Sequence, residues 1–276
     1  MTFRLAASSY LNSAPLIWSF LNGPHRGSVD FVEAVPARCA QMLAESSVDG
    51  ALVPVIEYQR IAGGSLVPNV CVGSRKEVLS VVLVSKNKHL ENIRSVALDE
   101  SSRTSATLVK VIFREFLDHE PEWTTRAPNL EEMLEMNDAA LIIGDPGMTF
   151  PRQGLNVWDM ASLWQQHTGL GFVFAMWMVS DDATDRARIV DFSAARDEGV
   201  NHIDDIVRSY QDKIPMRVEE LRNYLTENIV FKVDESMEKG LRLYFELAFK
   251  HHLIENVKPL RFISHAAAQR RNEKLV

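Results

Sequence analysis

The chain has 276 residues, 46% of them hydrophobic and 24% charged, which is the balance of a globular protein with one large domain or two modest ones. It carries 30 Lys and Arg against 37 Asp and Glu, so its net charge is −7. An acidic chain without a basic run is a poor nucleic-acid binder, because that affinity comes from cations that displace counterions. The chain also lacks the basic amphipathic helix of a membrane-surface protein.

The cysteines, the histidines and the N-terminal segment exclude further classes. Cys39 and Cys71 are too few for a disulfide framework and too far apart for a CxxC pair. The eight histidines show no metal-binding spacing. Polar residues interrupt the apolar segment 1–18, and the apolar stretch 169–179 is too short for a membrane helix. We therefore expect a cytoplasmic protein with reduced cysteines and no metal.

Strand and helix patterns alternate along the first two-thirds of the chain. In chain order, the sequence predicts strands at 3–8, 29–35, 51–53, 77–85, 95–98, 139–143 and 172–179. Helices are predicted from Pro36 and Pro54, and, from apolar spacing, over 108–116 and 161–167. Apolar residues then recur at helical spacing near 200–210, 215–225 and 241–248. The pattern predicts an α/β fold with mostly parallel sheets and a helical C-terminal region.

Two long apolar strands suggest how the domains are organised. The strands 77–85 and 172–179 bracket a middle block about the size of a small domain. Strands of this length could cross between two lobes, with a cleft between them. We therefore predict a discontinuous first lobe of residues 1–86 and 178–276, a second lobe of residues 87–177, and hinges near 79–88 and 172–179.

Two Ser-rich segments lie between a predicted strand and a predicted helix. One is Ser-Ser-Tyr-Leu-Asn-Ser-Ala-Pro at 8–15, and the other is Asp-Glu-Ser-Ser-Arg-Thr-Ser at 99–105. Ligands of open α/β sheets bind beyond the carboxyl ends of the strands, and the free amides at a helix start favour anions. Arg103 could add a bidentate hydrogen bond to a carboxylate. Helix capping by Ser or Asn accounts for both segments equally well.

Two further motifs each allow a functional and a structural interpretation. Asp145 follows the apolar strand 139–143, where it could orient a partner or cap the next turn. The segment 168–174 contains Gly-x-Gly, but it lacks the third glycine and is followed by a strand. The dinucleotide-binding fingerprint requires a helix at that point, so we reject it. The sequence contains no GxxxxGK[ST] phosphate loop and no GxSxG motif.

Six stretches together resemble the chorismate dehydratases of menaquinone biosynthesis, the family of the futalosine pathway. They are SYLNSAPL at 9–16, VDGALVPVIEY at 48–58, LSVVLVS at 79–85, LDESSRTSATL at 98–108, DAALIIGD at 138–145 and TGLGFVFAMW at 168–177. The resemblance implies a two-lobe fold like that of type II periplasmic binding proteins. It also implies a cytoplasmic hydro-lyase without a cofactor, which converts chorismate into 3-[(1-carboxyvinyl)oxy]benzoate.

The resemblance also implies a catalytic residue. Asn12 matches the asparagine that the family associates with catalysis. The candidate substrate-binding residues are Ser9, Ser80, Ser101, Ser102, Arg103, Thr104, Ser105, Asp145, Thr168 and Gly169. A carboxamide is not basic, so Asn12 cannot be the general base. The candidates for the base are the enolpyruvyl carboxylate of the substrate, Asp145 and Glu57.

Two other functions remain open at this point. The related 1,4-dihydroxy-6-naphthoate synthase shares the fold but usually carries a Cys-Pro-Asn-Asp loop near its start. This chain has Tyr10-Leu11-Asn12 instead, which favours the dehydratase. The other alternative is a non-catalytic binding protein for a small carboxylate.

Overall fold

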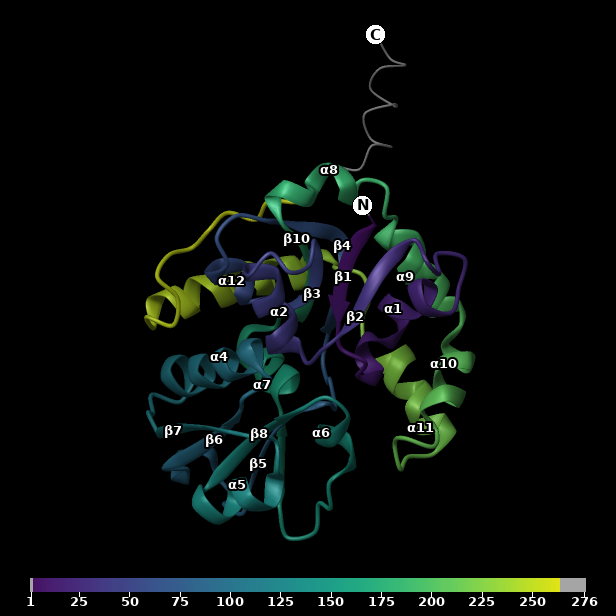
Figure 1. The fold of residues 1–276 in the computed structure, drawn as a ribbon. Helices are drawn as coiled ribbons and strands as arrows, with labels where there is room; N and C mark the ends of the chain where they lie inside the picture. Colours follow the sequence, from purple (N-terminus) through teal and green to yellow (C-terminus); the bar gives the residue numbers. More distant parts are fainter. Residues whose placement is uncertain (1, 264–276) are drawn as a thin grey trace.

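The computed structural model describes residues 2–263, which form two lobes, each built on a five-stranded sheet (Figure 1). The strand order is β2-β1-β3-β10-β4 in the first sheet and β7-β6-β8-β5-β9 in the second. The first sheet comprises β1 (Phe3–Ala7), β2 (Val29–Glu33), β3 (Gly50–Pro54), β4 (Ser65–Ser74) and β10 (Phe172–Val179). The second comprises β5 (Val81–Ser85), β6 (Ser95–Asp99), β7 (Glu122–Arg126), β8 (Ala139–Ile143) and β9 (Asn156–Asp159).

Helices cover both sheets. Those of the first lobe are α1 (Ala14–Leu21), α2 (Pro36–Ala44), α3 (Glu57–Arg60), α8 (Thr184–Ala187), α9 (Phe192–Asn201), α10 (Ile203–Tyr210), α11 (Val218–Asn223) and α12 (Glu235–Lys250). Those of the second lobe are α4 (Arg103–Val111), α5 (Leu130–Met136), α6 (Asp145–Thr149) and α7 (Met160–Thr168). Single turns lie at η1 (Leu11–Ser13), η2 (Leu90–Asn92), η3 (Ile112–Phe116), η4 (Asp181–Ala183) and η5 (Tyr224–Asn228). No helix within residues 2–263 is long and apolar enough to cross a membrane.

The apolar strand β8 shows why the second lobe has this architecture. All five of its residues are buried, as required of a strand covered on both faces. Successive side chains point to opposite faces, so Leu141 and Ile143 pack in the large core that α4 joins. Ala140 and Ile142 pack on the other side against α5. The alternation fixes the register of β8 and therefore the position of the loop that follows it.

The predicted lobe boundaries need correction. β5 pairs with β8 and β9 in the second sheet, and β10 pairs with β3 and β4 in the first over its whole length. The predictions that 81–86 belongs to the first lobe and 172–177 to the second are therefore wrong. The chain crosses between lobes at 75–80 and 169–171. Because β5 and β10 enter their sheets from the opposite lobe, each runs antiparallel to both of its neighbours, while the other four strands of each sheet run in one direction.

A backbone turn lies between β4 and β5, where the chain first crosses from one lobe to the other at 75–80. The sequence predicts one strand over 77–85, but Leu79 has a left-handed φ of 58° and β5 begins only at Val81. The Asp159 carboxylate accepts hydrogen bonds from the amides of Val78 (3.0 Å) and Leu79 (2.7 Å). These bonds replace the ladder that a continuous strand would have formed at this point.

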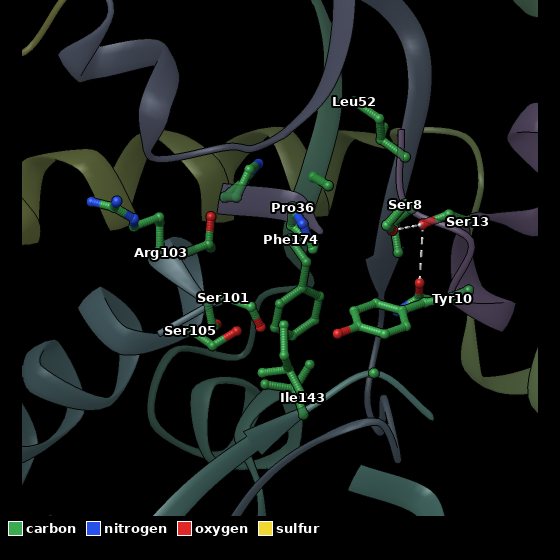
Figure 2. Close-up of a pocket in the computed structure, with 18 residues that line it drawn as sticks. Ser8, Tyr10, Ser13, Pro36, Leu52, Ser101, Arg103, Ser105, Ile143 and Phe174 are labelled. Atoms are coloured by element: carbon green, nitrogen blue, oxygen red, sulfur yellow. Dashed lines mark hydrogen bonds between the residues drawn. The ribbon is translucent and has the colours of Figure 1, made fainter. Parts of the chain in front are cut away.

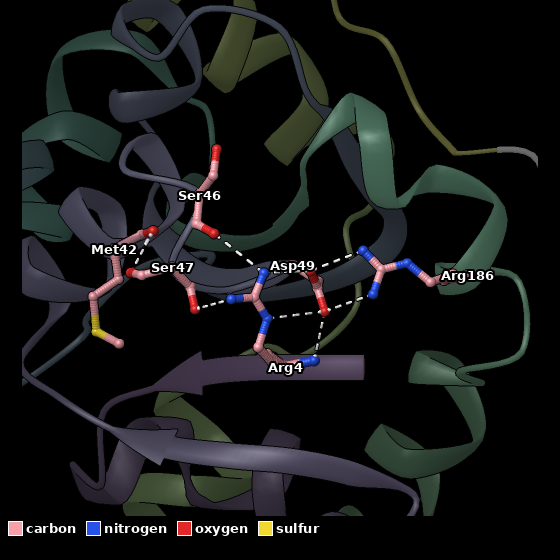
Figure 3. Close-up of polar contacts among 6 residues, drawn as sticks. All are labelled: Arg4, Met42, Ser46, Ser47, Asp49 and Arg186. Carbon is pink, nitrogen blue, oxygen red and sulfur yellow. Dashed lines mark hydrogen bonds and ion pairs between the residues drawn. The ribbon is translucent and has the colours of Figure 1, made fainter. Parts of the chain in front are cut away.

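A buried carboxylate ties the two chain segments of the first lobe together. Asp49 is 2% exposed and lies between Arg4 of β1 and Arg186 of α8, with N–O distances of 2.9 and 3.0 Å (Figure 3). Burial alone would raise the pKa of Asp49, but the hydrogen bonds from Arg4 and Arg186 lower it to about 2. The ion pairs therefore stabilise the fold above the usual carboxyl range, and this stabilisation is lost as the pH falls towards 2.

Candidate functional site

A narrow cavity of about 60 Å³ lies between the lobes, where β1 and β6 end and helices begin (Figure 2). Eighteen residues line it. The first lobe contributes Ser8, Tyr10, Asn12, Ser13, Pro36, Leu52, Pro54, Val72, Phe174 and Ala175; the second contributes Val81, Ser101, Ser102, Arg103, Thr104, Ser105, Ile143 and Gly144. The cleft predicted between two lobes is thus present, and both Ser-rich segments face it.

On the first-lobe side, hydroxyl groups hold the Asn12 amide. The Ser13 Oγ donates to Asn12 Oδ1 at 3.2 Å, and the Ser8 and Ser13 hydroxyls are 3.1 Å apart. Burial raises the pKa of the nearby Tyr224 hydroxyl of η5, which stays protonated. Because Ser13 occupies the amide oxygen, the amide nitrogen of Asn12 is the group best placed to donate into the cavity.

On the second-lobe side, the start of α4 presents backbone amides. Its N-cap residue Ser102 makes no side-chain capping bond within the described residues. The preceding turn is held instead by Asp99, whose Oδ1 accepts from the amide of Ser101 (2.9 Å) and from its hydroxyl (2.6 Å). The first amides of α4 and the hydroxyls of Thr104 and Ser105 therefore lie at the cavity, where the helix dipole favours an anion.

The remaining lining is apolar and contains no proton-transfer residue. Leu52, Pro54, Val72, Ile143 and Phe174 form the wall between the two polar sides. Among the eighteen residues, all within the described part of the chain, none is Asp, Glu, His or Lys. The arrangement suits a ligand with a flat apolar body and acidic groups at its ends.

Arg103 lies at the rim of the cavity and not at its centre. Its side chain points away from Tyr10 and Ser13 (Figure 2) and makes no ion pair with any residue in 2–263. It also lines a wider outer groove of about 770 Å³, together with Arg38, Arg60 and Lys110. Glu100 lines the same groove, and Arg38 and Arg60 form ion pairs with Glu45 and Glu57. Arg103 and Lys110 are therefore the cations of the groove that make no ion pair within residues 2–263.

The structure places six of the predicted site residues at the cavity: Asn12, Ser101, Ser102, Arg103, Thr104 and Ser105. The other five predicted residues do not line it. Thr168 and Gly169 form the C-terminal end of α7, where the Thr168 hydroxyl donates to the carbonyl of Trp164 at 2.7 Å. Gly169 has a left-handed φ of 72°, the usual C-cap conformation. A helix end thus explains this Thr-Gly pair, and its predicted role in substrate binding is withdrawn.

Ser9, Ser80 and Asp145 do not line the cavity. The Ser9 hydroxyl donates to Glu33 of β2. The Ser80 Oγ accepts from the Tyr224 hydroxyl at 2.6 Å. The Asp145 Oδ1 accepts from the backbone amide of Leu11 at 3.0 Å. Glu57, a candidate base, pairs with Arg60 at 2.7 Å and does not line the cavity.

Sequence reasoning did not select two residues that dominate the cavity. The Tyr10 hydroxyl points towards its centre beside the Phe174 ring (Figure 2). Burial raises the pKa of Tyr10, so the phenol stays protonated and can donate. Tyr10 stands inside the SYLN motif, so that motif could have revealed it. Phe174 lies in an apolar strand, and nothing in the sequence distinguishes it from the core residues around it.

Two lobes, each with a five-stranded sheet and a helix start facing a shared cleft, define the class of periplasmic-binding-protein-like folds. A Candida albicans protein described as having the generic periplasmic binding protein fold superposes with a TM-score of 0.64. It is 12% identical, and the match covers 96% of this chain and 98% of that one. A protein from Archaeoglobus fulgidus superposes with a TM-score of 0.75 at 16% identity, over 92% of this chain and 98% of that one. The predicted fold class is confirmed.

The sequence matches the family model described as menaquinone biosynthesis over residues 3–250, so the chain belongs to that family. The chorismate dehydratase of Thermus thermophilus is 28% identical over 234 residues, which cover 78% of this chain and 85% of the relative. The chorismate dehydratase of Campylobacter jejuni is 26% identical over 237 residues, which cover 85% and 88%. The resemblance identified from the six motifs is confirmed.

Proposed function

We propose that the protein is a chorismate dehydratase, a cytoplasmic hydro-lyase of the futalosine route to menaquinone. It removes water from chorismate and yields 3-[(1-carboxyvinyl)oxy]benzoate. Membership of the menaquinone biosynthesis family and two relatives named chorismate dehydratase support this proposal.

The reaction makes limited demands on the protein. One ring carbon of chorismate carries the enolpyruvyl ether and a hydrogen, and its neighbour carries a hydroxyl group. Loss of that hydrogen and that hydroxyl forms the third double bond of a benzene ring, which supplies a large driving force. The protein must therefore mainly hold the substrate, exclude water and assist the transfer of one proton.

The observation that carries the proposal is the opposition of two polar ends across an apolar wall. The uncapped start of α4 lies at one end and the Asn12 amide at the other. We assign one substrate carboxylate to the amides and hydroxyls of Thr104 and Ser105, and the ring to the wall that includes Phe174. Arg103 adds positive charge at the rim. The Asn12 amide nitrogen then donates to the hydroxyl group that leaves.

The cavity lining also bears on the identity of the base. The lining residues include no carboxylate and no imidazole, and Asp145 and Glu57 are engaged elsewhere. We assign the proton abstraction to the enolpyruvyl carboxylate of the substrate itself. It takes the ring proton as the carbon–oxygen bond to the hydroxyl breaks, and the proton then joins the departing hydroxyl as water. Asn12 and Tyr10 act as hydrogen-bond donors in this scheme.

Incubation of the purified protein with chorismate tests the proposal. We expect an aromatic product whose mass is lower than that of chorismate by one water, formed without added metal and in the presence of EDTA. A parallel incubation with cyclic dehypoxanthine futalosine tests the naphthoate synthase alternative. Binding of chorismate without turnover would overturn the enzymatic assignment in favour of a binding protein.

A further inference from the structure

The short helix that carries Asn12 has no cap from its own segment. The turn η1 begins after Tyr10, which has an extended backbone and makes no side-chain capping bond. The helix α1 follows directly, and its N-cap residue Ser13 makes none either. The amide of Leu11 at the start of η1 would therefore lack an acceptor within the segment that contains it.

The other lobe supplies the missing acceptor. Asp145 lies at the start of α6, 134 positions after Leu11, and its Oδ1 accepts from the Leu11 amide at 3.0 Å. This bond crosses the cleft, because η1 belongs to the first lobe and α6 to the second. The residue next to Asn12 is thus held by a group that comes into range only when the lobes lie together.

Gly144, which precedes Asp145, also contacts the first lobe across the cleft. Gly144 has φ 68° and ψ −152°, a conformation that side chains rarely adopt. A Cβ at this position would lie 2.8 Å from the Tyr10 ring, so the ring rests directly on the glycine backbone. Two consecutive residues of the second lobe therefore contact two consecutive residues of the first: Gly144 contacts Tyr10, and Asp145 contacts Leu11.

The surroundings of Asp145 affect its protonation, and its protonation affects the hydrogen bond to the Leu11 amide. No cation within residues 2–263 forms an ion pair with Asp145. Lys213 is near enough to interact with its charge, and that charge contributes to the raised pKa values of Tyr10, Tyr210 and Tyr224. Burial raises the pKa of Asp145 to about 6, although the Leu11 hydrogen bond and the Lys213 charge oppose the rise. The three tyrosines stay neutral because burial raises their pKa values as well.

We propose that Asp145 is a positioning residue of the reaction: its carboxylate caps the Asn12 segment from the opposite lobe and so couples closure of the cleft to the placement of the Asn12 amide. The inference rests on the proposed function. It replaces the predicted contact of Asp145 with substrate by an action through Leu11 and Asn12. A charged acceptor holds an amide more firmly than a neutral one, so protonation of Asp145 weakens the cap.

Steady-state kinetics of two substitutions test this role. Asp145→Asn keeps an acceptor oxygen but not the charge, so we expect kcat to fall about 5- to 10-fold. Asp145→Ala removes both, and we expect a fall of about 30-fold or more. KM should change less than 3-fold in either variant, since Asp145 does not line the cavity. The wild-type kcat should decrease below about pH 6, and the Asn variant should lose this dependence.

Two comparisons separate positioning from other roles. In the Asn12→Ala background, Asp145→Ala should cause little further loss, because the residue acts through Asn12. Asp191→Ala is the matched control: Asp191 caps α9 by accepting from the Ala194 amide at 2.9 Å and lines neither the cavity nor the outer groove, so kcat should not change. A loss of more than 1,000-fold in Asp145→Asn would overturn the proposal in favour of a base, and additive losses would overturn it too.

Hydrogen exchange of the Leu11 amide tests the cap without any turnover. We expect exchange at Leu11 to be at least 10-fold faster in Asp145→Ala than in wild type, with the Asn variant between them. Unchanged exchange would overturn the cap even if the protein converts chorismate. If the wild type does not convert chorismate, the proposed function fails, while the exchange result still decides whether Asp145 holds the segment.

Discussion

Two helix starts face each other across the cleft, and they are built differently. At the start of α4, Asp99 of the same lobe holds the preceding turn through Ser101. The first lobe adds hydrogen bonds to Thr104 from the Ile56 amide (3.3 Å) and the Tyr244 hydroxyl (2.9 Å). The start of η1 depends on the other lobe, because Asp145 accepts from the Leu11 amide across the cleft.

The difference separates holding a substrate from acting on it. On the proposed role of Asp145, an anion would bind at the start of α4 before the cleft closes. Closure would then bring Asp145 within reach of the Leu11 amide and place Asn12. Such an order of events suits an elimination, since the group that assists departure of the hydroxyl is placed after the substrate is bound.

The largest effect is expected on the Asn12 side. Asn12→Ala should lower kcat by about 100-fold or more, as for loss of a positioned hydrogen-bond donor, with little change in Tm. Asn12→Asp keeps the shape but adds negative charge beside a dianionic substrate, so KM should rise as well. Turnover and thermal unfolding of both variants check this. Near-normal turnover with a lowered Tm would assign Asn12 to helix capping, at about 1 kcal/mol of stability.

Gly144→Ala is a substitution in the second lobe that should disturb the Tyr10–Asn12 segment of the first lobe. The added Cβ would lie 2.8 Å from the Tyr10 ring and must displace it, so we expect kcat to fall about 10- to 50-fold. The positive φ by itself costs about 1–3 kcal/mol of stability. Gly154→Ala is the control, because Gly154 has φ 74° with no atom within 4 Å of the added Cβ. Equal kinetic losses in the two variants would show that strain alone is responsible.

Arg103→Ala tests the α4 side of the cleft. We expect KM for chorismate to rise about 10-fold and kcat to stay within 2-fold, because the loss of one charge-assisted hydrogen bond weakens binding. The effect should shrink as ionic strength increases, since Arg103 is exposed. Arg152→Ala removes another exposed guanidinium of the second lobe that lines neither cavity nor outer groove. An unchanged KM in Arg103→Ala would assign Arg103 to the surface.

The smallest effect is expected for Ser102→Ala. An N-cap serine usually contributes about 1 kcal/mol to the free energy of unfolding. The Ser102 hydroxyl makes no capping bond, so Tm should stay nearly constant while KM rises about 2- to 5-fold. A lowered Tm with unchanged KM would mean that this hydroxyl serves the helix and not the ligand.

Much of the cavity could be predicted because its polar residues are contiguous in the sequence. The segments 8–13 and 99–105 each follow a strand, and that position places them at the cleft. The contact between Asp145 and Leu11 could not be predicted, because it joins residues 134 positions apart and depends on how the lobes meet. Thr168-Gly169 misled because a helix C-cap and a binding loop use the same residue types.

The strands near the first crossing show a second limit. β4 was not predicted, because Pro68 and Asn69 interrupt its apolar pattern and Asn69 has a left-handed φ of 58°. The apolar run 77–85 concealed the turn at Leu79, which depends on two hydrogen bonds to Asp159. In both segments, partners distant in sequence stabilise an irregular backbone. The local sequence does not reveal these partners, so the irregularity could not be predicted.

The insertion of β10 between β3 and β4 has a consequence for biosynthesis of the chain. A ribosome makes β3 and β4 about one hundred residues before β10, so the first sheet lacks its inner strand during that time. The strands of the second sheet are consecutive from β5 to β9, and that lobe can fold as soon as it leaves the ribosome. Until β10 is made, the edges of β3 and β4 that it covers have no strand partner from this sheet and are open to pairing with another chain.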